Sequence, residues 1–248
     1  MAAWFPFTGS ALIIFCITVS CQNRTMIWRM NSTTEIGGYS PIIIGEPRLE
    51  NEPSFSSFSF NGMNQGLMMP LNPLEDFNEF TIEVLFNPSS EGSAEQRFVH
   101  FQDKKGNRGL IEIRLVQGGK WYLDTYLHVG ETNTGLTLKD PTKLHPCDTW
   151  YWAALIYDGK TMKHYVNAIK EISGEIEFGP MESGLISLGV RLNQVYWFKG
   201  KISEIRFYPN ALEVDRLQKT TNYSISRTSN PASLDRGFDD EILFGFSQ

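Results

Sequence analysis

The sequence predicts an all-β fold, a sandwich of two antiparallel sheets. Short runs of alternating apolar and polar residues recur along the chain, turn residues separate them, and only one stretch has a helical pattern. The chain has 248 residues, of which 41% are hydrophobic, so it can build one sizeable core. All-β sandwiches of this length commonly form a single domain.

The clearest element is a hairpin over residues 150–171. Two alternating runs, 150–157 and 162–167, flank the dipeptide Asp158-Gly159, which is the strongest short-range signal for a two-residue β-turn. Both faces of the first run are apolar or aromatic. A strand of that kind belongs inside a sheet that is covered on both faces.

Further strands are expected on both sides of this hairpin. The runs with strand character cover residues 42–44, 54–60, 80–86, 97–102, 110–116, 121–128, 172–178, 185–190 and 202–208. Residues 132–144 are expected to be a loop with at most one short strand, because Pro141 argues against a helix there. The one stretch with a helical pattern is 210–219.

The central tryptophan-rich strand, its Asp-Gly turn and the Tyr-Val-Asn that follows resemble the centre of laminin-G-like jelly-roll domains, in the concanavalin-A-like lectin/glucanase superfamily. Two more stretches fit this pattern, FSFNG with FTIEVLFNP over residues 58–88, and ISLGV with FKGKISEIRFYPNALEVDRLQ over residues 186–218. The resemblance covers residues 55–218. It implies a jelly-roll sandwich with a concave sheet face, which is the groove in glycan-active members. It says little about function, because sandwich folds host many activities.

The expected domain organisation has four parts. Residues 1–21 carry no charged side chain and contain a dense apolar run, which is typical of a signal peptide or of a lipoprotein leader ending at Cys21. An uncleaved membrane anchor is the third alternative. The remaining parts are a linker over 22–39, the laminin-G-like sandwich over 40–218 and a C-terminal tail over 219–248, whose apolar end could dock as a last strand. We therefore expect a secreted or envelope-anchored, extracytoplasmic protein.

Charge and cysteine content argue against several classes of protein. The formal net charge is −6 and no dense Lys/Arg block occurs, so nothing favours nucleic-acid binding. Cys16, Cys21 and Cys147 make neither a disulfide framework nor a zinc motif. The sequence also lacks dinucleotide-binding, phosphate-loop, serine-hydrolase and zinc-protease motifs. We expect neither a cofactor nor a metal.

The turn at Asn61-Gly62 bears on calcium binding. In the laminin-G-like pattern this turn usually reads Phe-Asp-Gly, with another Asp a few residues later. Here Asn61 and Asn64 stand in those places. Amides lack the negative charge that Ca²⁺ prefers in its ligands. We therefore expect that folding does not require calcium.

Two neighbouring strands carry the candidate binding face. In residues 110–116 and 121–128, charged and aromatic side chains alternate with apolar ones. A four-residue connection makes the two strands an antiparallel pair, so their polar positions share one sheet surface. With two residues contributed by neighbouring strands, the candidate ligand-binding residues are Glu112, Arg114, Tyr122, Asp124, Tyr126, His164 and Arg191.

These residue types suit a saccharide, because aromatic rings stack on sugars while arginine and carboxylate groups make paired hydrogen bonds. We expect a binding module for a polysaccharide or glycoconjugate, with an extracellular protein as another possible partner. Two alternatives stay open. Ordinary cross-strand pairs on a solvated face would use the same residues. A glycoside hydrolase or polysaccharide lyase could use Glu112 with Asp124, or Tyr126 with Arg114, but we assign no catalytic residue.

Overall fold

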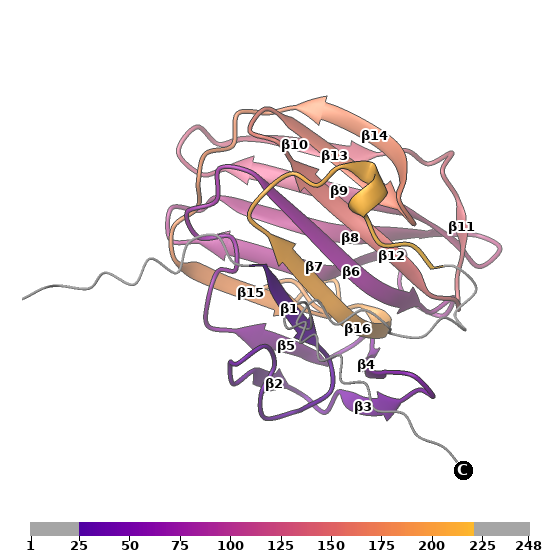
Figure 1. The fold of residues 1–248 in the computed structure, drawn as a ribbon. Coiled ribbons are helices and arrows are strands. Elements are labelled where there is room, and N and C mark those ends of the chain that lie inside the picture. The colour runs from indigo at the N-terminus through magenta and orange to yellow at the C-terminus, as the bar shows by residue number, and fades with distance from the viewer. Residues whose placement is uncertain (1–24, 221–248) are drawn as a thin grey trace, which may run out of the picture.

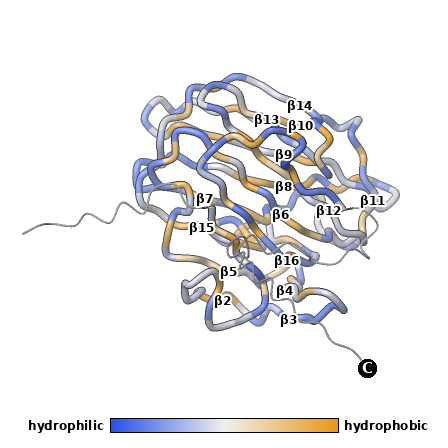
Figure 2. Tube along the Cα trace, viewed as in Figure 1, coloured by the Kyte–Doolittle hydropathy of each residue, from blue (hydrophilic) through white to orange (hydrophobic). Residues whose placement is uncertain are grey.

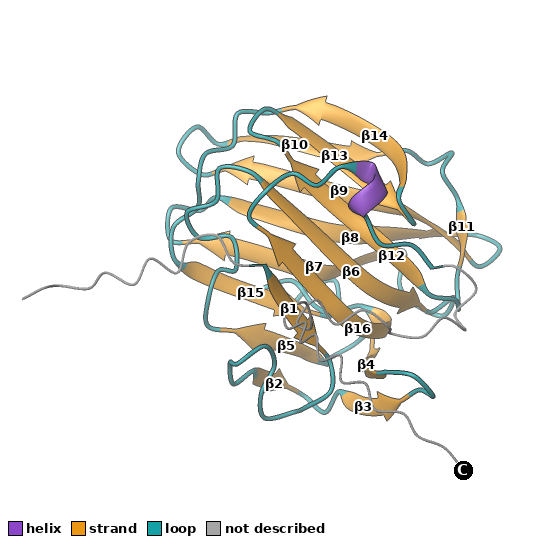
Figure 3. Cartoon of the chain, in the orientation of Figure 1, coloured by secondary structure: helices purple, strands orange, loops and turns teal. Residues whose placement is uncertain are grey.

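A computed structural model of the chain describes residues 25–220, which form two antiparallel sheets stacked face to face (Figure 1). The predicted all-β sandwich is therefore confirmed. Within these residues the only helical element is a single 3₁₀ turn, η1 (Val214–Arg216), drawn in purple in Figure 3. The helix expected over 210–219 was wrong apart from this turn.

The first sheet contains the central hairpin. In spatial order its strands are β14 (Ile169–Glu175), β13 (Thr161–Val166), β12 (Tyr151–Tyr157), β6 (Phe80–Pro88), β16 (Lys199–Tyr208), β4 (Ser56–Asn61) and β3 (Arg48–Asn51), and β1 (Met26–Arg29) also pairs with β16. The β12–β13 hairpin is the predicted one. Its turn closes because Gly159 has a φ of 86° and the Asp158 carboxylate accepts the Thr161 backbone N–H at 2.8 Å.

The second sheet lies behind the first in Figure 1. In spatial order its strands are β10 (Thr134–Lys139), β9 (Lys120–Val129), β8 (Arg108–Val116), β7 (Glu95–Asp103), β15 (Gly184–Leu188), β5 (Gly66–Met69) and β2 (Ile42–Ile44), and the short β11 (His145–Pro146) pairs with β9. Strand β10 is the one short strand allowed for within residues 132–144.

The core fills the space between the sheets, where the inward positions of the strands are apolar (Figure 2). Aromatic rings from both sheets meet there. Phe86 of β6 stacks on Phe98 of β7 with ring centroids 4.5 Å apart, and its edge meets Trp121 of β9 at 5.2 Å. Many of the aromatic side chains of the chain thus pack between the two sheets.

The sandwich begins before residue 40, inside the segment expected to be a linker. Trp28 on β1 is fully buried in the core, and its ring meets Phe207 of β16 at 4.8 Å. Gly37, with a φ of 60°, passes so close to the Trp28 ring that any side chain there would overlap it. The expected linker over 22–39 therefore contributes strand β1 and three fully buried core residues, Trp28, Met30 and Ile36.

The segment after β16 covers the outer face of the first sheet. Leu217 packs there with Ala154 and Ile156 of β12 and Tyr165 of β13. The Gln218 backbone N–H is also bonded to the buried Glu83 carboxylate at 2.6 Å. This cover explains why both faces of β12 are apolar.

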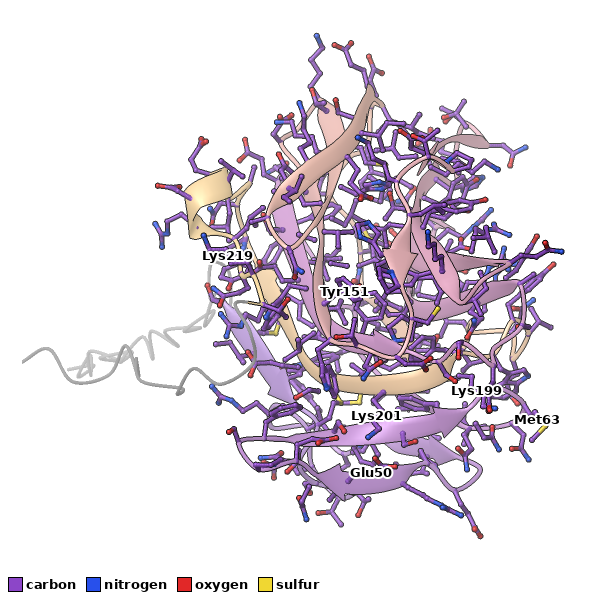
Figure 4. The ribbon with its side chains drawn as sticks, turned by 90° about the vertical axis from the view of Figure 1, so that its right-hand side faces the viewer. Glu50, Met63, Tyr151, Lys199, Lys201 and Lys219 are labelled. Atoms are coloured by element: carbon purple, nitrogen blue, oxygen red, sulfur yellow. The ribbon has the colours of Figure 1, made fainter. Side chains whose placement is uncertain are left out.

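Charged pairs hold the edge of the first sheet. Lys201 on β16 reaches across β4 to Glu50 on β3, with Nζ and Oε2 2.7 Å apart (Figure 4). In residues 25–220 no helix has the length and apolar character needed to cross a membrane. The expected leader, with Cys16 and Cys21, and nearly all of the C-terminal tail, with its apolar end at 242–246, lie outside the described residues.

Candidate functional site

The predicted binding residues lie mostly on one surface, which we call the outer face: the side of β7, β8 and β9 turned away from the core. The register of β8 and β9 places Glu112 opposite Asp124, and Arg114 opposite Tyr122. Tyr126 is two residues further along β9 on the same side, opposite Leu110. The period-two alternation of β8 and β9 therefore correctly predicted that these side chains lie on one surface.

The charged groups on the outer face hold one another. Arg114 extends diagonally to Asp124, with Nε and Oδ2 2.7 Å apart, and also contacts Glu95 at 2.6 Å and Glu112 at 3.6 Å. Arg97 of β7 lies 2.6 Å from Glu112 and 3.1 Å from Glu95. The result is one ion network across three strands rather than a set of free ligand-binding groups.

The two central carboxylates are buried although they are on the outer face. Asp124 is 1% exposed and Glu112 is 4% exposed. Burial raises the pKa of Glu112 to about 7; Arg97 opposes this shift and the neighbouring Asp124 adds to it. The ring of Tyr196 lies 3.6 Å from the guanidinium of Arg97, the partner of Glu112. An ordinary solvated strand face does not fit this arrangement.

The two tyrosines remain partly exposed. Tyr126 lies over Gly135 of β10, where a side chain would collide with the tyrosine ring. The Arg108 guanidinium lies 5.8 Å from the centre of the Tyr126 ring, and the His128 ring lies 5.9 Å away. Tyr126 is thus a supported aromatic platform, as a sugar-stacking ring requires.

A cavity of about 790 Å³ opens over β7 and β15 and the adjoining loops, two strands from Tyr126 in the order of the sheet. Drug-sized ligands occupy cavities of this size. Arg191 was predicted as a site residue and does line the cavity. The cavity is also lined by the polar residues His100, Gln102, Lys104 and Asn193 and by the apolar Leu185.

His100 is the most buried polar side chain in the cavity wall, with 2% exposure. Its Nδ1 accepts the Leu192 backbone N–H at 3.0 Å, which leaves the ring proton on Nε2. Nε2 has no hydrogen-bond partner among the described residues. Burial and then the charges of Arg191, Arg108 and Arg97 lower the pKa of His100 to about 3, so the ring is neutral at physiological pH.

His164 does not join the outer face, and its placement there was wrong. It lies on the inward side of β13, fully buried between the sheets. Its Nδ1 is 2.9 Å from the Thr125 hydroxyl of β9, and Glu171 of β14 lies between His164 (3.4 Å) and His145 (2.6 Å). This group ties the two sheets together internally.

Sequence reasoning missed His100, Gln102 and Arg108. The first two alternate with the inward Val99 and Phe101 on β7, so the same period-two signal could have found them. Arg108 was missed because the strand begins at residue 108, two residues before its expected start at 110.

The remaining groups offer no separate chemistry. Residues 25–220 contain no cluster of three or more His, Cys, Asp or Glu side chains able to hold a metal ion. At the Asn61 turn, the amide oxygen of Asn61 accepts the backbone N–H groups of Met63 and Asn64. Burial raises the pKa of Cys147 to about 11, so its thiol stays protonated near neutral pH and is a poor nucleophile.

Several solved structures share this fold. Domain 4 of AbnA, an extracellular GH43 arabinanase from Geobacillus stearothermophilus, determined in complex with arabinotriose, matches with a TM-score of 0.58 at 19% identity, over 77% of this chain and 94% of that one. The NanB sialidase of Streptococcus pneumoniae matches with 0.53 at 16% identity, over 66% and 28%. The binding domain of botulinum neurotoxin DC, in complex with SialylT, matches with 0.55 at 11% identity, over 77% and 49%.

At these identities the likeness establishes the fold alone. No curated protein matches the sequence. The laminin-G family model of the concanavalin A-like lectin/glucanases superfamily matches residues 61–218, which is more than half of the chain. The chain therefore belongs to the laminin-G-like family of the concanavalin A-like lectin/glucanases superfamily.

Proposed function

We propose that this protein is a carbohydrate-binding module that receives a saccharide across the outer face and the adjoining cavity. The observation that carries the proposal is the pairing of the supported Tyr126 ring with a cavity two strands away. His100 of β7, Leu110 of β8 and Tyr126 of β9 form one cross-strand row. Two strand spacings, about 10 Å, separate its ends, a span that one oligosaccharide can bridge.

The fold neighbours support a saccharide as the ligand. Domain 4 of the arabinanase was determined with arabinotriose, and the neurotoxin binding domain with SialylT. An amphipathic cavity of about 790 Å³ with the apolar Leu185 beside polar His100 and Gln102 suits a sugar ring, which has both apolar and hydroxyl-bearing sides.

Binding is favoured over hydrolysis by the state of the two carboxylates. Glu112 and Asp124 are the only acidic pair that sequence reasoning offered for glycosidase chemistry. Asp124 is held by Arg114 and Glu112 by Arg97, and both are almost fully buried. A catalytic carboxyl group must reach the glycosidic oxygen or the anomeric carbon. We therefore assign these two groups to shaping the face.

The proposed compartment is extracytoplasmic, on the basis of the uncharged apolar leader over residues 1–21. Fractionation should find the mature chain outside the cytoplasm, and full-length protein free in the cytosol would contradict this. Labelling with a fatty acid tests the lipoprotein alternative, because Cys21→Ala removes the acceptor. Loss of label in that variant indicates anchoring through Cys21. A label absent from wild type excludes lipidation and leaves ordinary export or an uncleaved anchor, which the mass of the mature chain distinguishes.

A glycan array followed by calorimetry on the best hit tests the binding function. Tyr126→Ala should weaken binding by about 1–2 kcal/mol, the scale of an aromatic contact. Tyr39→Ala is the matched control, because Tyr39 is an exposed tyrosine outside the outer face. Equal losses in both variants, or no saccharide hit at all, would refute the proposal. New reducing or unsaturated ends in the incubated hit would replace it with the enzyme alternative.

A further inference from the structure

The cavity over β7 and β15 has two arginines in or next to its wall that form no ion pair among the described residues. Arg191 lines it and Arg108 lies next to it, opposite Gln102 in the strand register. Neither guanidinium forms an ion pair within residues 25–220, and the Nε atom of each is buried without a hydrogen-bond partner. Lys104 adds an exposed ammonium group at the cavity rim.

The acidic groups nearby already have other partners. Asp103 lines the cavity, but its two oxygens accept four hydrogen bonds, from Lys105 N, from Asn107 N and Nδ2, and from Glu182 N. Glu112 interacts electrostatically with Arg191, but its Oε2 forms an ion pair with Arg97, 2.6 Å from Nε. The cavity therefore presents cationic donors and no free carboxylate.

His100 adds a neutral donor to the same wall. Its Nε2–H is unpartnered and the residue is only 2% exposed. The Leu192 backbone N–H donates to the other ring nitrogen, Nδ1, and so fixes the ring. A buried donor without a partner costs free energy until an acceptor arrives. An oxygen with a full negative charge is the acceptor best matched to a donor that sits among arginines.

We infer that this cavity is a subsite for an anionic saccharide, in which a sugar carboxylate or sulfate binds between Arg191 and Arg108 and accepts the His100 Nε2–H. Leu185 is 41% exposed and offers an apolar wall for the sugar ring. This inference rests on the proposed function and adds the ligand's charge class. It divides the site into a stacking end at Tyr126 and an anion end at Arg191.

The test uses matched acidic and neutral oligosaccharides with the full chain. The probes are trigalacturonate and trimannuronate, each with its carboxyl-reduced neutral counterpart, and galactotriose bearing 6-O-sulfate. Calorimetry should find at least one acidic probe bound tenfold or more tighter than its neutral counterpart, the range expected for a charge-assisted hydrogen bond. Its affinity should fall as NaCl is raised, because salt screens the charge. Whether the uronate or the sulfate binds tighter identifies the anion.

Arg191→Gln should remove this preference, while Lys105→Gln should keep it. Lys105 is a matched control, because it is one residue from the cavity-lining Lys104, does not line the cavity and forms only an exposed ion pair with Glu182. If a neutral saccharide binds equally well and responds to Tyr126→Ala but not to Arg191→Gln, the anion subsite is refuted and the binding module stands. If none of the probes nor any array glycan binds, both proposals fail.

Discussion

Arg114 on β8 and Asp124 on β9 form a diagonal cross-strand ion pair, with Nε and Oδ2 2.7 Å apart, and Asp124 is only 1% exposed. A buried carboxylate of this kind depends on its partner, because it has lost most of its contact with water. Arg114 was expected from the sequence to bind ligand. In the structure its guanidinium contacts Asp124, Glu95 and Glu112.

Removing Arg114 should therefore destabilise the fold. We expect Arg114→Ala to lower the free energy of unfolding by about 3 kcal/mol, because it leaves Asp124 buried without its counter-charge. Arg114→Lys should also destabilise the protein, since a single ammonium group cannot contact Asp124, Glu95 and Glu112 together. Urea denaturation measures both changes. Arg48→Ala, on the exposed edge strand β3, is the control and should change stability by under about 0.5 kcal/mol.

The raised pKa of Glu112 predicts a pH dependence with a definite sign. Its folded value of about 7 lies above the ordinary 4.5, so its contribution to stability is fully present below pH 4.5 and is lost as pH rises through 7. Between pH 4.5 and 8, the stability of wild type relative to Glu112→Gln should fall by about 2–3 kcal/mol.

The comparison with the Gln variant is needed because His100 acts in the opposite direction. Its folded pKa of about 3 is below the ordinary 6.5, so its contribution is lost as pH falls below 6.5. Taking the difference between wild type and variant cancels this term. A difference that stays constant from pH 4.5 to 8 would show that folding does not raise the pKa of Glu112.

Local alternation predicted the outer face well, because the period of two on β8 and β9 depends only on neighbouring residues. This alternation correctly predicted that five residues share one surface: Glu112, Arg114, Tyr122, Asp124 and Tyr126. It could not tell that the carboxylates would be buried, since burial depends on strands beyond this pair, such as β7, whose Arg97 lies 2.6 Å from Glu112.

Other errors have the same long-range origin. His164 alternates correctly on β13, but only the pairing of the sheets decides which side of that strand faces inward. The cavity is built by β7, β15 and the loop at residues 191–193, whose meeting depends on the strand order rather than on any local pattern. Met26–Arg29 was too short a run, beside turn residues, to be recognised as a strand.

The N-terminal strand gives a direct test of the domain boundary. Trp28 is fully buried, so Trp28→Ala should cost about 3–5 kcal/mol of stability. Arg29→Ala, on the same strand but exposed, should cost under about 1 kcal/mol. A chain starting at residue 40 should likewise lose cooperative unfolding, whereas one starting at residue 25 should keep it. If these two chains are equally stable, residues 25–39 are a linker and not part of the folded domain.

The Asn61 turn predicts how the protein responds to calcium. The amide of Asn61 accepts two backbone N–H groups and donates to the Asn64 side chain at 2.8 Å, so the turn is closed by neutral groups. Millimolar Ca²⁺ should leave the melting temperature of wild type unchanged. The double variant Asn61→Asp, Asn64→Asp replaces that hydrogen bond with two adjacent carboxylates, which repel each other and supply the hard oxygen ligands that Ca²⁺ prefers. It should melt lower than wild type without calcium and recover when Ca²⁺ is added. A rise of many degrees for wild type in Ca²⁺, abolished by Asn61→Ala, would show that the amide loop itself holds the ion.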